Sequence, residues 1–157
     1  MDGAFLIPGS EAAMTWSLLM AAILGSLLGI ERSIAGKHAG MRTYALVSLG
    51  SCLFVLIGTI ASSHLQPFFG GVNPLQIAGS IVIGIGFIGS GLVALKSDMH
   101  VELTTASGIW VVAGIGMACG FGFYMLAVVT TVIAAAILSL FLHLENGIRK
   151  KLSSTQG

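Results

Sequence analysis

The sequence predicts an all-α membrane protein, a five-helix transmembrane bundle with its N-terminus outside and its C-terminus cytoplasmic. Of the 157 residues, 55% are hydrophobic and 8% are charged, and the mean hydropathy is +0.99. A soluble domain carries about 25% charged residues, so these few charges could not cover a water-soluble globule of this size. The expected surroundings are a lipid bilayer. The net charge of +1 argues against a basic face for nucleic acid.

Uncharged runs predict the first three crossings. The run 12–30 has the length of one transmembrane helix, because about 20 apolar residues span the hydrocarbon core. The next uncharged run, between Arg42 and Lys96, is far too long for one helix of that kind. A segment with two prolines and a glycine pair, at 66–74, predicts a turn that divides this run into two crossings.

The uncharged run between Glu102 and Glu145 also requires two crossings, with a tight turn at Gly120-Phe121-Gly122. A transmembrane domain is therefore expected over 1–143, followed by a short basic cytoplasmic tail over 144–157. The five helices are predicted at about 12–30, 44–63, 75–95, 104–120 and 123–143.

The positions of the basic residues predict the orientation. With five crossings, every Lys and Arg falls on one side of the membrane, after the first, third and fifth helices. Cytoplasmic segments of membrane proteins carry an excess of Lys and Arg, so this side is expected to be the cytoplasm. Four or six helices would split the basic residues between the two sides, which favours five.

Polar residues gather at the predicted cytoplasmic face. A carboxylate–guanidinium clamp between Glu31 and Arg42 would join the first two helices, because paired charges are tolerated at the membrane boundary. The alternative is that the charged side chains simply extend to the interface. Thr104 or Thr105 is expected to cap the fourth helix. The predicted polar cluster comprises Glu31, Arg32, Arg42, Thr43, Thr104 and Thr105.

The predicted third helix contains the densest group of glycines, at Gly84, Gly86, Gly89 and Gly91. One interpretation is a packing face at the centre of the protein. The other is an unwound segment whose carbonyls face an ion or substrate. Trp110 is expected to pack against this helix.

Two further glycine pairs have the four-residue spacing of helix contacts. The pair Gly25/Gly29 lies in the first predicted helix, and the pair Gly116/Gly120 lies in the fourth. Either pair is an internal contact or the interface of a homodimer, and the sequence leaves both alternatives open.

Asp98, His100 and Glu102 alternate in a polar segment and are weak candidates for a divalent cation site, the alternative being a solvated loop. No Asp, Glu, Lys or Arg lies inside a predicted span, which argues against a proton pump or cation antiporter. No cofactor and no catalytic constellation are expected, so an enzyme is not predicted.

Three stretches then resemble the MgtC/SapB family of bacterial inner-membrane proteins. They are GIERSIAGKHAGMRTYALVSLG from Gly29 to Gly50, GIGFIGSGLV from Gly84 to Val93, and LTTASGIWVVAGIGMACGFG from Leu103 to Gly122. The resemblance implies a five-helix domain in the inner membrane. The positions carried over are Glu31, Arg32, Gly40, Arg42, Thr43, Gly84, Gly86, Gly89, Gly91, Thr104, Thr105 and Trp110.

This chain departs from the family pattern at Asn73, Ser90 and Glu102. The cytoplasmic domain that longer members append is also expected to be absent here.

The resemblance implies a role in adaptation to low magnesium and in virulence. It also implies a regulatory role, because the best-studied members of the family are regulators that bind the F-type ATP synthase and restrain ATP production. The leading hypothesis is therefore a non-enzymatic membrane regulator that acts by helix–helix contact with a membrane complex. The alternative is a small channel or transporter for a cation or small solute, in which the third helix supplies backbone carbonyls and Glu31 and Arg42 gate the mouth.

Overall fold

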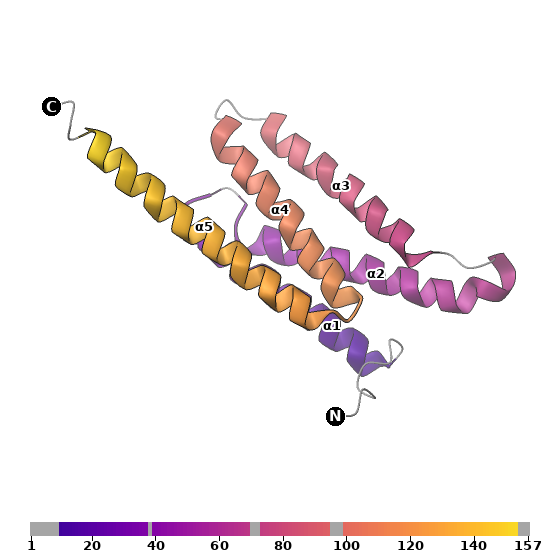
Figure 1. Ribbon diagram of the computed structural model, residues 1–157. Helices are drawn as coiled ribbons and strands as arrows, with labels where there is room; N and C mark the ends of the chain where they lie inside the picture. Colours follow the sequence, from indigo (N-terminus) through magenta and orange to yellow (C-terminus); the bar gives the residue numbers. More distant parts are fainter. Residues whose placement is uncertain (1–9, 38, 70–72, 95–98, 154–157) are drawn as a thin grey trace.

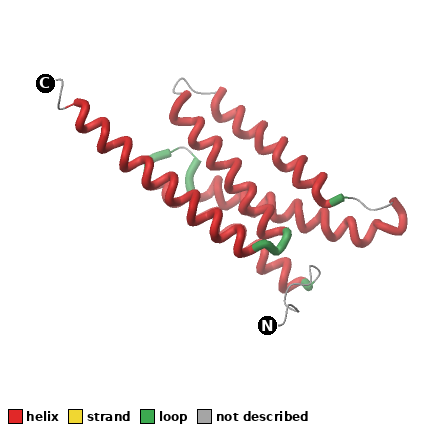
Figure 2. Tube along the Cα trace, viewed as in Figure 1, coloured by secondary structure: helices red, strands yellow, loops and turns green. Residues whose placement is uncertain are grey.

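The computed structural model describes the backbone of residues 10–37, 39–69, 73–94 and 99–153. Side chains are described for residues 10–37, 39–63, 73, 75–93 and 103–140. Within these ranges the chain forms five α-helices and no strand, as Figures 1 and 2 show. The helices are α1 (Glu11–Ile34), α2 (Met41–Phe69), α3 (Pro74–Ala94), α4 (Met99–Gly120) and α5 (Tyr124–Ser153).

The predicted fold class is confirmed. Four helices, α1 to α4, are long and apolar enough to cross a membrane, and the described apolar part of α5, Tyr124–Leu140, is shorter. The basic residues predict that the segments following the first, third and fifth helices lie on one side of the membrane. In the structure, the α1–α2 connection and the C-terminal ends of α3 and α5 do lie at one end of the bundle (Figure 1). Which side of the membrane this end faces stays a prediction.

Most helices extend past the apolar runs that predicted them. At its start, α1 is capped by Ser10, whose Oγ accepts a hydrogen bond from the Ala13 N–H at 3.2 Å. At the start of α4 the prediction was wrong, because the helix begins at Met99 and neither Thr104 nor Thr105 caps it. Hydropathy locates the apolar span, whereas a helix continues for as long as its backbone remains hydrogen-bonded.

The proline-rich turn is also shorter than predicted. Helix α2 passes through Pro67 and ends at Phe69, so the connection to α3 is only 70–73. A proline removes one backbone donor and crowds the preceding turn, and near a helix end this cost is small enough to be tolerated. At the other end of the chain, α5 runs unbroken from Tyr124 to Ser153. The division into a membrane domain and a cytoplasmic tail at residue 143 stays a prediction.

Helix α4 is the centre of the bundle. It contacts each of the other four helices. In the most apolar 18-residue stretch of α4, 56% of the residues are buried, compared with 6% in the corresponding stretch of α3. Helix α3 makes its main contacts with α4 and α2 and lies at the side of the bundle (Figure 1). Fully buried side chains of the core come mainly from α2 and α4, and include Tyr44, Val55, Ile109, Val112 and Ile115.

The tight turn predicted between the last two helices is confirmed. Helix α4 ends at Gly120, and Gly122 adopts a φ of 79°, the left-handed region that glycine enters without steric cost. The Gly122 N–H donates to the Cys119 carbonyl at 3.0 Å, and the Phe123 N–H donates to the Ala118 carbonyl at 2.8 Å. These two hydrogen bonds form a Schellman motif, which ends α4 and reverses the chain into α5.

Replacing Gly122 with alanine is expected to lower the free energy of unfolding by about 1 kcal/mol, because an L side chain strains the left-handed conformation. The measurement is the thermal unfolding midpoint of the detergent-solubilised protein. Gly79→Ala is the matched control, since Gly79 lies in α3 with no atom within 4 Å of an added Cβ. Equal midpoints for the two variants would contradict the prediction.

Candidate functional site

A buried ion pair lies at the C-terminal end of α1. The Arg32 Nε donates to Glu31 Oε2 at 2.6 Å, and Arg32 Nη2 donates to Glu31 Oε1 at 3.1 Å. The Arg32 side chain is only 2% exposed and that of Glu31 is 17% exposed. Such two-point pairing holds the guanidinium in one orientation and offsets part of the cost of burying its charge.

The predicted clamp between Glu31 and Arg42 is wrong: Glu31 pairs with Arg32 of its own helix, and among the described side chains no ion pair joins it to the exposed Arg42. Arg32 does not extend to the interface either. It continues the face of α1 that contains Gly25, Leu28 and Gly29 and packs against α2, so the helical repeat turns its side chain inward.

Tyr44 links α2 to α4. Its side chain is completely buried, and its hydroxyl donates to the backbone carbonyl of Thr105 at 3.4 Å. Glu31, Arg32, Tyr44 and Thr105 are called the buried polar cluster below. It connects three helices at the end of the bundle where the α1–α2 connection lies (Figure 1).

Sequence reasoning missed Tyr44, although a signal was available. The chain has two tyrosines, and this one directly follows Arg42 and Thr43 in the stretch that resembles the MgtC/SapB family. Nothing in the local pattern indicates that its ring points into the bundle. That orientation depends on Gly108 of α4, where an added Cβ would meet the Tyr44 hydroxyl.

Two buried polar atoms in this region have no hydrogen-bond partner among the residues that the structure describes: Arg32 Nη1 and the hydroxyl of the fully buried Ser48. A guanidinium carries five N–H donors, so the Glu31 carboxylate leaves some of them unused. The arrangement contains a fixed charge pair and no nucleophile beside a base. It can therefore set the relative rotation of α1, α2 and α4, which is a structural role.

The remaining predicted polar residues lie elsewhere. Arg42 and Thr43 line a separate surface cavity of about 480 Å³, together with Ser33, Lys37 and Gly40. Its cations favour anions, such as those of lipid headgroups, and disfavour a metal ion. Thr104 is exposed on α4, whereas Thr105 is buried.

The weak candidates for a divalent cation site stay a prediction. Asp98 lies outside the described residues, and the side chains of His100 and Glu102 also lie outside them. Among the side chains that are described, no three His, Cys, Asp or Glu residues form a group that could hold a metal ion.

The glycine pairs of α1 and α4 are internal contacts. An added Cβ at Gly25 would lie 2.7 Å from the Tyr44 carbonyl oxygen, and one at Gly29 would lie 2.6 Å from the Met41 Cα. The Gly116/Gly120 pair faces the same helix from α4, with Cys52 O at 2.9 Å from an added Cβ at Gly120. These glycines therefore bring α1 and α4 against the backbone of α2, and they do not form the surface of a dimer.

The glycines of α3 behave differently, and both predictions about them were wrong. No atom lies within 4 Å of an added Cβ at Gly84, Gly86 or Gly91, and at Gly89 there is only ordinary contact with Ala106. They do not form a central packing face. Helix α3 is also continuous from Pro74 to Ala94, so its carbonyls remain in helical hydrogen bonds.

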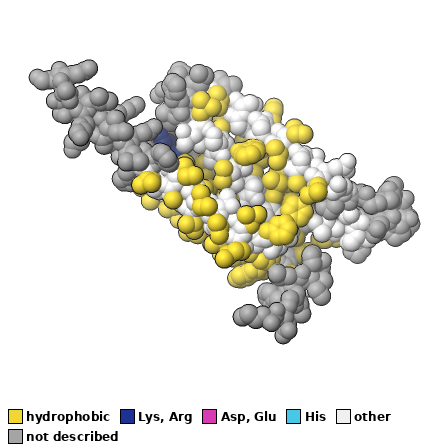
Figure 3. All heavy atoms as spheres, in the orientation of Figure 1, with side chains coloured by type: hydrophobic (Ala, Val, Ile, Leu, Met, Phe, Trp, Pro, Cys, Tyr) yellow, Lys and Arg dark blue, Asp and Glu magenta, His cyan; other side chains and the backbone are white. Residues whose placement is uncertain are grey.

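The packing of Trp110 against α3 stays a prediction. The residue is 56% exposed, and it lines a cavity of about 340 Å³ beside Val82 and Ile85 of α3. The buried residues of α3 are Ile81 and Ile85, which face α2 and α4. Hydrophobic side chains cover much of the described surface that faces the viewer in Figure 3. Trp110 is among the exposed large hydrophobic residues of the bundle.

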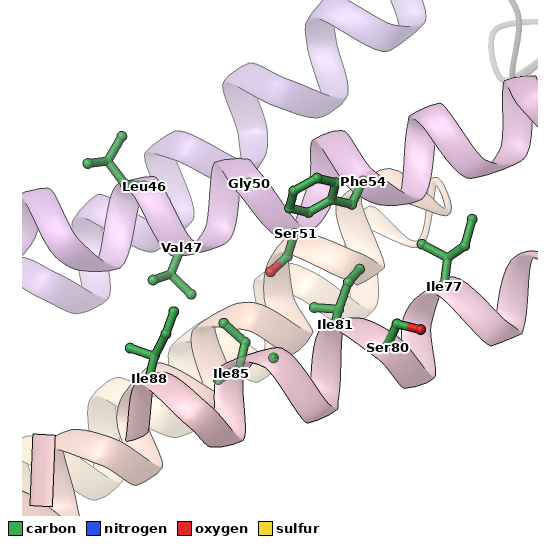
Figure 4. A pocket seen from close by; sticks show the side chains of 11 residues that line it. Leu46, Val47, Gly50, Ser51, Phe54, Ile77, Ser80, Ile81, Ile85 and Ile88 are labelled. Carbon is green, nitrogen blue, oxygen red and sulfur yellow. The ribbon is translucent and has the colours of Figure 1, made fainter. Parts of the chain in front are cut away.

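An apolar groove of about 550 Å³ separates α2 from α3. Figure 4 shows side chains from both helices directed into it, and its exposed neighbours Leu46 and Phe54 place it on the lateral surface of the bundle. This α2–α3 groove is lined by Leu46, Gly50, Ser51 and Phe54 of α2 and by Ser80 and Gly84 of α3, among others.

Comparisons with known proteins point to one family. The model of the MgtC family matches residues 18–147. YhiD of Escherichia coli K12, described as a candidate magnesium transporter, is 38% identical over 125 residues, which cover 79% of this chain and 58% of YhiD. MgtC of Salmonella typhimurium is 40% identical over 118 residues, which cover 74% of this chain and 47% of MgtC.

SrpB of Synechococcus elongatus is 32% identical over 154 residues, 92% of this chain and 84% of SrpB. The chain spans a little over half the length of the first of these relatives, covering 58% of YhiD. No solved structure matches this chain.

Proposed function

The chain belongs to the MgtC family and is a multi-pass protein of the bacterial inner membrane, and from this premise we propose that it is a non-enzymatic regulator. It acts by helix–helix contact with a larger membrane complex. The partner implied by the family resemblance is the F-type ATP synthase, whose ATP production the protein would restrain during adaptation to low magnesium and in virulence.

The exposure of α3 is the observation that supports this proposal. In its most apolar 18-residue stretch only 6% of the residues are buried within the bundle, so most of the helix surface is left exposed at the side. Gly84 and Gly91 leave its backbone bare on that surface. Apolar side chains give no net attraction between helices in lipid, whereas small residues let backbones approach closely and gain packing energy. A glycine-rich helix at the side of a bundle is therefore suited to contact another membrane protein.

The direct test is capture of the tagged protein from native bacterial membranes in mild detergent, followed by quantitative mass spectrometry. The expected result is reproducible enrichment of one membrane complex, with ATP synthase subunits as the first candidates. An unrelated multi-pass protein with the same tag and expression level is the control. Recovery of no membrane partner above that control would count against the regulator.

A transporter is the second candidate, and it is supported by the description of YhiD as a candidate magnesium transporter. The continuous α3 removes the route that depended on free backbone carbonyls. The test is Mg²⁺ flux into liposomes that contain the purified protein. Flux no greater than in protein-free liposomes would remove this candidate, and saturable flux would favour it over the regulator.

A further inference from the structure

The floor of the α2–α3 groove is made of small residues from both helices. Gly50 and Ser51 lie on the α2 side, and Ser80 and Gly84 lie on the α3 side. An added Cβ at Gly50 or Gly84 would have no atom within 4 Å, so these positions leave open space in the groove. Exposed large side chains, Leu46 and Phe54 among them, stand at the edges. This shape admits the backbone of a further helix more closely than a surface of large residues would.

Ser51 contributes an unused hydroxyl to this floor. The residue is 4% exposed, lines the groove and makes no hydrogen bond within the part of the chain that the structure describes. Figure 4 shows its oxygen directed into the space between α2 and α3. Several other hydroxyls of the bundle bond back to the carbonyl four residues earlier, namely those of Ser17, Ser26, Thr59, Ser80, Ser107 and Thr131.

We propose that the α2–α3 groove receives one transmembrane helix of the partner complex. That helix places a small residue against Gly84 and a hydrogen-bonding side chain, a hydroxyl or an amide, opposite the Ser51 hydroxyl. This inference rests on the proposed regulator function and identifies the surface through which it acts.

A helix that carries a polar side chain fits the groove better than a lipid acyl chain does. A lipid acyl chain fills apolar space but offers no group to Ser51, whose hydroxyl would stay unpaired in a medium without water. A second copy would have to enter the groove with one of its own helices, and the test below distinguishes this case by the mass of the adduct. A helix with a small residue and a polar side chain satisfies both the shape and the hydroxyl.

The test uses the full chain in native membranes with a photoreactive benzophenone side chain in place of Phe54, at the edge of the groove. The expected product is an adduct with a polypeptide that is also recovered by tag-based capture. In this background, Gly84→Leu should reduce the adduct at least tenfold, because the new side chain fills the groove. Ser51→Ala should reduce it about 3-fold to 15-fold, the range expected for one interhelical hydrogen bond in a membrane.

Each variant has a matched control on α3. Gly86→Leu adds the same side chain two residues away, where an added Cβ is equally free of contacts but the position does not line the groove. Ser90→Ala removes a hydroxyl that already donates to the Phe87 carbonyl at 2.9 Å. Both controls should leave the adduct at the level of the parent. If Gly84→Leu shifts the unfolding midpoint relative to Gly86→Leu, the Ser51→Ala comparison decides.

Three outcomes overturn the groove proposal: an adduct at twice the mass of the chain, an adduct with lipid alone, or a polypeptide adduct that survives both groove variants. If a partner is captured but its adduct does not depend on the groove, the regulator function stands and only the docking surface is wrong. If the parent captures no partner, both proposals fail.

Discussion

Gly116→Ala is expected to be the most damaging single-methyl substitution in this protein, lowering the free energy of unfolding by about 3 kcal/mol or more. An added Cβ would meet the Ser48 carbonyl oxygen, with the Ser48 carbonyl carbon at 2.8 Å and its Cα at 2.9 Å. These are backbone atoms of α2, so no side-chain rotation relieves the overlap and the two helices must move apart. Overpacking in a well-packed core costs about 1–3 kcal/mol, and more where the neighbour cannot yield.

The thermal unfolding midpoint in detergent and the fraction of monodisperse protein measure this effect. Gly114→Ala is the matched control, because Gly114 lies two residues earlier in α4 with no atom within 4 Å of an added Cβ. Its expected effect is neutral or a gain of up to about 1 kcal/mol from better helix propensity. If Gly116→Ala behaved like Gly114→Ala, the close contact between α2 and α4 would be disproved.

Glu31→Gln is expected to lower the free energy of unfolding by about 3–5 kcal/mol, because it leaves a buried guanidinium without its counter-charge. Arg32 is 2% exposed, and its Nη1 already has no partner, so the two hydrogen bonds to Glu31 are the compensation that the described residues provide. Unfolding midpoints in detergent measure the loss.

The double variant Glu31→Gln/Arg32→Met should recover much of this loss, since no buried charge then remains. Arg42→Gln is the control: it removes an exposed guanidinium and is expected to change stability by about 0.5 kcal/mol or less. A Glu31→Gln variant as stable as Arg42→Gln would show that the ion pair is not required to offset the charge of Arg32.

Part of the candidate site could be predicted from the sequence. Glu31, Arg32 and Thr105 were identified because charged and hydroxyl side chains are rare next to apolar spans and must find partners there. Their pairing was not predicted, because spacing along the chain does not determine which way a side chain turns. The clamp with Arg42 was therefore wrong, and Tyr44 was missed.

The glycines of α3 and α4 show even more clearly that spacing along the chain does not determine contacts between helices. Counting them predicted that α3 would be the central helix, yet α4 holds that place. A glycine permits close approach on one face of a helix only, and a neighbour must occupy that face before the glycine acts as a contact. Gly116 has such a neighbour in α2, whereas Gly84 faces an open groove.

The amino-acid sequence by itself determined the number of helices, the turn at Gly120-Phe121-Gly122 and the placement of the α1–α2 connection and the C-terminal ends of α3 and α5 at one end of the bundle. These depend on the transfer of apolar and charged groups between water and lipid, which sums along the chain and needs no knowledge of neighbours. Only the tertiary structure decided which helix is central, which glycines are in contact and which polar side chains meet. Those outcomes depend on helix rotation, and rotation is set by packing between segments that are distant in sequence.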